Sequence, residues 1–155
     1  MNFLKTFFIG AFMLIYCSLT AQEKPLWLRY PSISPDGKTI VFCYKGDIFL
    51  VDSKGGKASQ LTTHSAYDSH PIWAPDGKSI AFTSTRDGAM DLFLVSITGG
   101  TPRRITSFTG NAIPECFTPD GKEISYSYNA AGKLHQGLDD LGRNQSTTLY
   151  STENK

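Results

Sequence analysis

The sequence has few features that would crosslink the chain or draw it to a charged partner. It has three cysteines in 155 residues and a formal net charge of +1. So balanced a charge offers no obvious attraction for a nucleic acid or another polyanion. After the first 21 residues, no apolar run approaches the roughly 20 residues that a transmembrane helix needs. We therefore expect that the chain after residue 21 binds no nucleic acid and does not enter a membrane.

The first 21 residues have the pattern of a secretory signal peptide. Lys5 supplies the positive start, residues 7–16 are an apolar run too short to span a bilayer, and Ala21 is a small residue at the expected cleavage site. Lipidation at Cys17 is an alternative, but the bulky Tyr16 stands where a small residue is expected. Cleavage after Ala21 removes one Lys from the 15 basic residues and none of the 14 acidic residues, which leaves a formal charge of zero.

A repeat runs through the rest of the chain. Pro-Asp-Gly-Lys occurs at residues 35–38, 75–78 and 119–122, in steps of 40 and 44 residues. Apolar residues follow each copy in register, and they are Ile40, Ile80 and Ile124, then Phe42, Phe82 and Tyr126. Pro presets the first central position of a turn and Gly takes the positive φ that closes it, so each copy predicts a tight hairpin between antiparallel strands.

The second half of the repeat adds two more strands. Residues 47–51 and 91–95 are β-rich runs, each followed at the same spacing by a double glycine and then by Leu-Thr or Ile-Thr. Each unit therefore has four short strands, and Thr85 to Gly88 enlarges the central hairpin of the second unit. Four-stranded units of this length are typical of β-propeller blades. The predicted fold class is all-β.

The third unit breaks the pattern. Residues 129–146 are polar and irregular, and only Thr148 to Tyr150 resembles a returning strand. The predicted organisation is a signal peptide at 1–21, blade 1 with its lead-in at 22–66, blade 2 at 67–110, and a partial blade 3 with an irregular insertion at 111–155. A propeller closes with about four to eight blades, so we expect these residues to belong to a longer protein. Alone, they would leave open sheet edges that favour aggregation.

The repeat resembles the WD40-like repeat of the TolB and tricorn-protease propellers. The opening, residues 25–37 followed by Tyr44 to Phe49, looks like that of exported tricorn-like serine peptidases. The resemblance implies a propeller that controls peptide access, followed by a PDZ module and a catalytic domain with a nucleophilic Ser and a His base. None of those downstream elements lies in the sequence, so the resemblance assigns no catalytic residue.

Several polar side chains suggest sites, and each has a plainer explanation. His64, Asp68 and His70 lie close in sequence but lack a fourth metal ligand. His135 falls in the irregular segment, and no spacing selects a Ser-His-Asp triad around it. Arg103 belongs to a basic pair too short for a nucleic-acid site. The sequence therefore predicts no catalytic residue, no metal site and no cofactor.

The two mature cysteines and one sequon complete these candidates. Cys43 aligns with Thr83 and Ser127, and Cys116 aligns with strand positions of the other units, so packed thiols are favoured over a disulfide. A glycosylation sequon begins at Asn144.

Three hypotheses remain open for function. The first is the propeller segment of an exported, periplasmic or secreted tricorn-like peptidase, which would meet a peptide or protein substrate and the rest of its own chain. The second is a TolB-like propeller that binds a partner protein. The third is a remnant without function.

Overall fold

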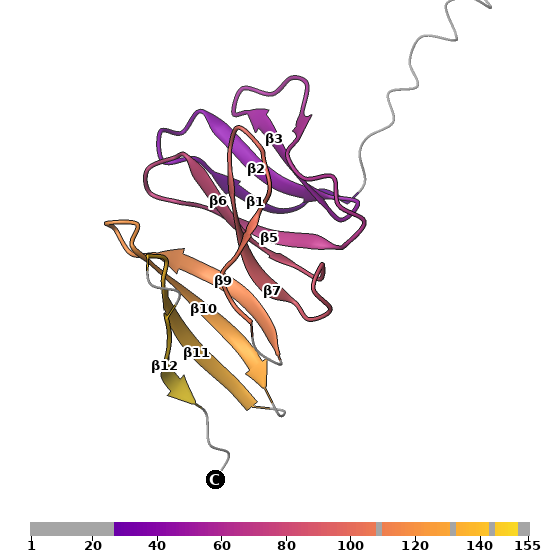
Figure 1. Ribbon diagram of the computed structural model, residues 1–155. Helices are drawn as coiled ribbons and strands as arrows, with labels where there is room; N and C mark the ends of the chain where they lie inside the picture. Colours follow the sequence, from indigo (N-terminus) through magenta and orange to yellow (C-terminus); the bar gives the residue numbers. More distant parts are fainter. Residues whose placement is uncertain (1–26, 108–109, 131–132, 143–144, 152–155) are drawn as a thin grey trace, which may run out of the picture.

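Three four-stranded antiparallel sheets make up the computed structural model, which describes residues 27–107, 110–130, 133–142 and 145–151. They lie one after another in sequence order (Figure 1). The first contains β1 (Arg29–Ile33), β2 (Thr39–Tyr44), β3 (Asp47–Asp52) and β4 (Ser59–Gln60). The second contains β5 (Asp68–Trp73), β6 (Ser79–Ser84), β7 (Asp91–Ser96) and β8 (Arg103–Arg104). The third contains β9 (Asn111–Phe117), β10 (Glu123–Ala130), β11 (Lys133–Asp140) and β12 (Gln145–Ser151).

Each sheet has the strand order of a propeller blade. Successive strands are neighbours throughout, and β5 contacts both β1 and β9 along the inner edge of the row. The part of the chain that the structure describes contains no helix. The all-β prediction is confirmed, and we call the sheets blades 1, 2 and 3. The predicted blade limits in sequence remain predictions, and the signal peptide lies outside the described residues.

The Pro-Asp-Gly-Lys segments form the hairpins that their chemistry predicts. In the first, Gly37 has a φ of 73° and its N–H donates to Ser34 O at 2.9 Å. The Asp36 carboxylate accepts a 3.1 Å hydrogen bond from the Lys38 N–H. The same two bonds recur in the other copies, which explains why the motif keeps Asp and Gly at these positions.

The central hairpins differ in length as predicted. In blade 1 only Lys45 and Gly46 separate β2 from β3, and both have positive φ, at 52° and 87°. Two such residues form the turn that suits a tight hairpin. In blade 2 residues 85–90 intervene between β6 and β7. This longer loop places Arg86 at the end of the blade.

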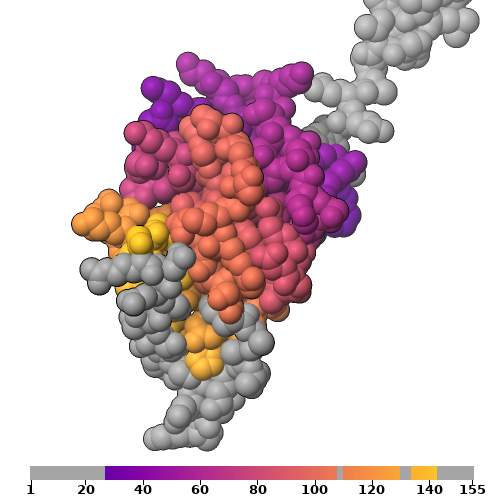
Figure 2. All heavy atoms as spheres, viewed as in Figure 1, coloured from indigo at the N-terminus to yellow at the C-terminus, as the bar shows by residue number. Residues whose placement is uncertain are grey.

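Two apolar cores lie between the blades. The first core lies between blades 1 and 2. Its blade 2 residues include Ile80, Phe82 and Phe93, which are at most 2 % exposed. The second joins the opposite side of blade 2 to Ile124 and Tyr126, both fully buried. The atoms of the three blades form a continuous surface in the space-filling view (Figure 2). Burial between sheets, rather than within one, therefore supplies the core.

The third unit corrects the sequence prediction. The segment 129–146 is not an irregular insertion, because β10 runs to Ala130, β11 covers half of the remaining residues and β12 begins at Gln145. The residues read as a returning third strand belong to β12, so this unit has four strands and is not partial. The positions of β11 that face blade 2 hold polar or small residues, which are His135, Gly137 and Asp139. The strand therefore lacks the alternating apolar residues by which β3 and β7 were predicted.

No helix of the described segments is long and apolar enough to cross a bilayer.

Candidate interaction surface

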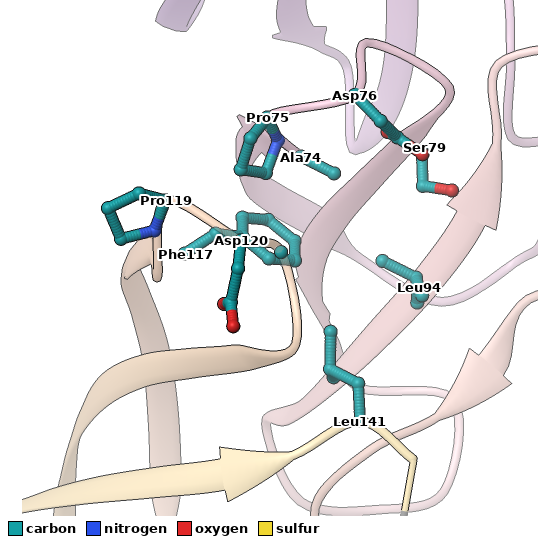
Figure 3. A pocket seen from close by; sticks show the side chains of 10 residues that line it. Ala74, Pro75, Asp76, Ser79, Leu94, Phe117, Pro119, Asp120 and Leu141 are labelled. Carbon is teal, nitrogen blue, oxygen red and sulfur yellow. The ribbon is translucent and has the colours of Figure 1, made fainter.

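A groove between neighbouring Pro-Asp-Gly turns occurs twice on one end of the molecule. The groove between blades 2 and 3 has a volume of about 350 Å³, and that between blades 1 and 2 about 440 Å³. Leu94, Phe117 and Leu141 line the apolar part of the first groove, while Asp76 and Asp120 lie at its turns (Figure 3). The repeat thus places a similar groove, with a mixed polar and apolar lining and carboxylates at its edge, between blades 1 and 2 and between blades 2 and 3.

The turn carboxylates are held in place by their own hairpins. Asp36 accepts hydrogen bonds from the Ser34 hydroxyl at 2.6 Å and from the Lys38 N–H, and these bonds lower its pKa. Thr118 and Lys122 hold Asp120 in the same way and lower its pKa. The nearby lysine ammonium groups lie 3.6 to 3.7 Å from these carboxylates. The charges of Asp36 and Asp120 are therefore balanced locally, and the lining of both grooves combines polar with apolar groups.

The opposite end of blade 2 is fixed by a buried ion pair. Arg86 Nη2 lies 3.1 Å from both carboxylate oxygens of Asp68, which is fully buried. The same guanidinium lies over the rings of Phe82 and Phe93, 5.4 and 4.8 Å from their centroids. Removing one partner of a buried pair leaves an uncompensated charge, so this pair fixes the long hairpin rather than serving an open site.

A second buried acid lies at the start of β7. Asp91 is fully buried and receives hydrogen bonds from Thr106 Oγ1 at 2.9 Å and Arg104 Nη2 at 2.5 Å. In blade 1, Asp47 and Thr62 repeat the carboxylate–hydroxyl contact at 3.5 Å. The signal was present in the sequence as an Asp and a Thr at the same separation in both blades. Arg104 therefore has a structural role, because it binds the buried carboxylate of Asp91.

The three residues that the sequence places close together in the inter-blade connection, but does not predict as metal ligands, have other contacts. His64 Nδ1 accepts a hydrogen bond from the Ala66 N–H at 3.0 Å, and Asp68 is bound by Arg86. The His70 ring lies against that of Tyr30 in a tilted arrangement, with centroids 3.8 Å apart, and burial lowers the pKa of His70. Among the residues that the structure describes, no three His, Cys, Asp or Glu side chains come together as a metal site would require.

Ser69 and His70 form a contact of the kind found between a catalytic serine and its base. Ser69 Oγ lies 3.1 Å from His70 Nδ1, but Ser69 is fully buried. A nucleophile has to reach the substrate. The neighbouring acid, Asp68, is bound by Arg86. The pair therefore has the contact of a nucleophile and base without access to a substrate.

The two cysteines are unlike each other. Cys43 is buried, donates its thiol hydrogen to Asp68 O at 3.0 Å, and has its pKa raised by burial. Cys116 is exposed, with Sγ 3.1 Å from Ser125 Oγ. Neither is in a disulfide. The prediction of a packed thiol is confirmed for Cys43 and wrong for Cys116, which lies on the side of blade 3 away from blade 2.

The remaining candidates lie around blade 3. His135 is on β11, not in an irregular segment, and stacks on Tyr128 with centroids 4.8 Å apart. Arg103 Nη2 donates to Leu141 O at 3.2 Å, so it bridges blades 2 and 3. The sequon at Asn144 lies outside the described residues. No sequence feature had indicated that the side of β11 facing blade 2 would be polar.

Comparison with known proteins gives the family. The family described as the tricorn protease N-terminal beta propeller domain matches residues 25–140, which cover all of the first two blades and most of the third. The chain belongs to this family. Tricorn protease homolog 1 of Streptomyces coelicolor is 36 % identical to this chain over 73 residues, which are 47 % of this chain and 7 % of that protein. This tricorn-type propeller chain thus spans less than a tenth of that relative.

Other similarities agree with the propeller fold. Dipeptidyl-peptidase 5 of Porphyromonas gingivalis is 33 % identical over 69 residues, covering 38 % of this chain and 10 % of the relative. The solved structure of TolB from Acinetobacter baumannii is 27 % identical with a TM-score of 0.69, covering 81 % of this chain and 33 % of TolB. The tricorn-type chain is therefore the N-terminal propeller part of a peptidase-related protein, with TolB-like blades.

Proposed function

We propose that the chain is part of the propeller of an exported tricorn-like serine peptidase, periplasmic or secreted, and that its blades guide or filter peptides for a catalytic domain outside these residues. Membership of the tricorn propeller family carries the proposal. The buried Ser69 and the ion-paired Asp68 support a non-catalytic role for these blades. The groove repeated between the turns, with its mixed polar and apolar lining, offers a surface suited to a peptide in transit.

The coding sequence downstream of Lys155 gives the first test. Further blades, a PDZ module and a serine-protease domain would support the proposal. An early stop, or blades alone, would contradict it.

The second test uses the full parent protein with the groove filled. Ser79 lines the groove between blades 2 and 3, and Ser79→Tyr would occupy it. If the groove guides long substrates, kcat/KM should fall several-fold for long peptides and stay unchanged for short ones. Ser59→Tyr, on the exposed strand β4, is the matched control. An equal loss for both peptide lengths, or no loss, would contradict a role in access.

A second candidate is a propeller that binds a partner protein without an enzyme domain. The similarity to TolB at 27 % identity favours it. A parent made only of blades, which retains a protein partner through purification and loses it with Ser79→Tyr, would support this alternative.

A further inference from the structure

A further pocket lies at the end of blades 1 and 2 that is opposite to the Pro-Asp-Gly turns. It has a volume of about 450 Å³ and a predominantly apolar lining. The turn of Lys45 and Gly46 between β2 and β3 borders it, and Tyr67, which precedes β5, lines it from blade 2. The buried Cys43 of β2 also lines it. This pocket is therefore separate from the two grooves between the turns.

The pocket lies on the side of blade 1 that faces blade 2. Arg29 pairs with Cys43, and paired residues of antiparallel strands direct their side chains to the same face of the sheet. The Cys43 thiol donates to Asp68 O of blade 2, which identifies that face. The Arg29 guanidinium lies over the ring of Trp27, 5.2 Å from its centroid. The pocket therefore belongs to an existing contact between two blades.

Two aromatic side chains of the pocket are exposed to water. Trp27 is 68 % exposed and Tyr67 is 46 % exposed. Tyr67 remains exposed although blade 1 lies before it, and its ring lies against Gly46, where a Cβ would come within 3.1 Å of it. Exposed aromatic rings around an apolar pocket mark a surface that binds apolar groups.

Arg29 and Lys45 bring two positive charges to the same pocket. Both are exposed, and neither forms an ion pair with a carboxylate of the residues that the structure describes. The Lys45 ammonium lies 5.3 Å from the centroid of the Tyr44 ring. Among the described residues, no Asp or Glu lines the pocket. Because the two charges have the same sign and no lining acid offsets them, the pocket favours an anionic ligand.

The blade architecture does not require these side chains. In the contact between blades 2 and 3, Ser69 holds the strand position of Arg29, and Asn111 holds the position of Tyr67. Neither of these residues is a cation or an aromatic residue. The combination of rings and positive charges is therefore particular to the contact between blades 1 and 2, which favours a binding role over a structural one.

The backbone of the pocket favours an acidic side chain, rather than the C-terminus of a peptide, as the anion. A terminal carboxylate is commonly held by unoccupied backbone N–H groups. Here the Tyr67 N–H donates to Thr85 Oγ1 at 3.1 Å, and the Asp68 N–H donates to Gly46 O at 2.7 Å. Recognition of the anion is therefore left to the two cationic side chains, whose long stems reach a carboxylate within an extended peptide.

We propose that this pocket binds a peptide segment in which an Asp or Glu stands beside an aromatic or large aliphatic residue. The apolar side chain occupies the space between Trp27 and Tyr67, and the carboxylate pairs with Arg29 and Lys45. The inference rests on the proposed function, in which the blades guide peptides. It adds the class of segment that they select, at the other end of the blades from the grooves between the turns.

Binding of synthetic peptides to the full parent protein tests the proposal. The probe is the peptide Gly-Ser-Phe-Glu-Ser-Gly, acetylated at its N-terminus and amidated at its C-terminus, and titration calorimetry gives its Kd. Replacing Glu by Gln in the probe should weaken binding about fivefold, the upper range for one exposed ion pair. Replacing Phe by Ala should weaken binding about tenfold, because a ring leaves the apolar space. Mass spectrometry after each titration checks that the peptide is intact.

Variants of the protein locate the binding site. Arg29→Gln and Lys45→Gln should each weaken binding of the Glu peptide about fivefold and leave binding of the Gln peptide unchanged. Lys57→Gln, which removes an exposed positive charge outside the pocket, is the matched control. Trp27→Ala should weaken binding of the Phe peptide more than that of the Ala peptide. Near-UV circular dichroism checks that each variant folds, as expected for exposed positions.

Three outcomes would overturn the proposal. The first is an equal Kd for the Glu and Gln peptides, and the second is an equal loss of binding in Lys57→Gln. The third is a Gln peptide with a free C-terminal carboxylate that binds as tightly as the Glu peptide, which would assign the anion to a chain end. None of these readouts involves proteolysis or the grooves between the turns, so failure here would leave the proposed function to its own tests.

Discussion

The contact between blades 1 and 2 and the contact between blades 2 and 3 use the same backbone register with different chemistry. In blade 2 the third strand presents Phe93 and Val95 to blade 1. In blade 3 the matching positions are Gly137 and Asp139. The ring of Tyr126 fills the space that Gly137 leaves. The hairpins and the strand pairing are therefore the same in both blades, while the side chains between the blades differ.

The largest effect is expected in the apolar contact. Phe82→Ala should destabilise the protein by about 3–5 kcal/mol, because it removes a fully buried ring and leaves a cavity between blades 1 and 2. Urea unfolding measures this. Phe42→Ala is the matched control at the same position of blade 1, on the face that no described blade covers, and should cost less. Equal costs would mean that burial between blades 1 and 2 does not stabilise Phe82.

The polar contact has its own steric requirement. A Cβ at Gly137 would clash with the ring of Tyr126, so Gly137→Ala should destabilise the protein by about 1–3 kcal/mol through overpacking. The cause is close approach rather than backbone conformation. In a Tyr126→Leu background the same substitution should cost much less, and a double-mutant cycle measures the difference. Additive costs would show that the ring does not set the requirement.

The repeat predicted the parts of the fold that depend on the local chain. Pro, Asp and Gly form each turn through bonds within five residues, so the motif alone located the hairpins. The face of β11 toward blade 2 could not be predicted, because Gly137 is explained only by Tyr126 on the paired strand. The burial of Asp91 could not be predicted for a related reason, since its partners Arg104 and Thr106 lie on and just beyond the outer strand.

Asp139 should make the contact between blades 2 and 3 sensitive to pH. Desolvation by burial raises its pKa to about 6, partly opposed by Arg103, and Asp140 raises it further. Because the folded pKa lies above the unfolded one, the unfolded state binds fewer protons between about pH 4 and 6. Stability should therefore fall as pH rises through this window and level off above it.

Replacing the carboxylate tests this origin. Asp139 Oδ1 is buried with no hydrogen-bond partner among the residues described. Asp139→Val restores the residue of the other blades and should stabilise the protein at pH 8 by about 1–2 kcal/mol. Urea midpoints from pH 4 to 8 should also lose their dependence in that window. Asp140→Asn removes only the smaller contribution of the neighbouring carboxylate, so most of the pH dependence should remain in that variant. An unchanged pH profile in Asp139→Val would assign the dependence to another group.

The smallest effect is expected from the hydrogen bonds that join the inner strands. Thr83→Val removes the donor to Ala112 O while keeping the shape of the side chain, and should cost about 0.5–1.5 kcal/mol. Cys43→Val removes the weaker thiol donor to Asp68 O and should cost less. Hydrogen exchange at the Ala112 amide should quicken only in Thr83→Val, and exchange at the Asp68 amide should quicken only in Cys43→Val. Exchange that quickens at both amides in either variant would indicate that the three blades open together, and that the two contacts are not independent.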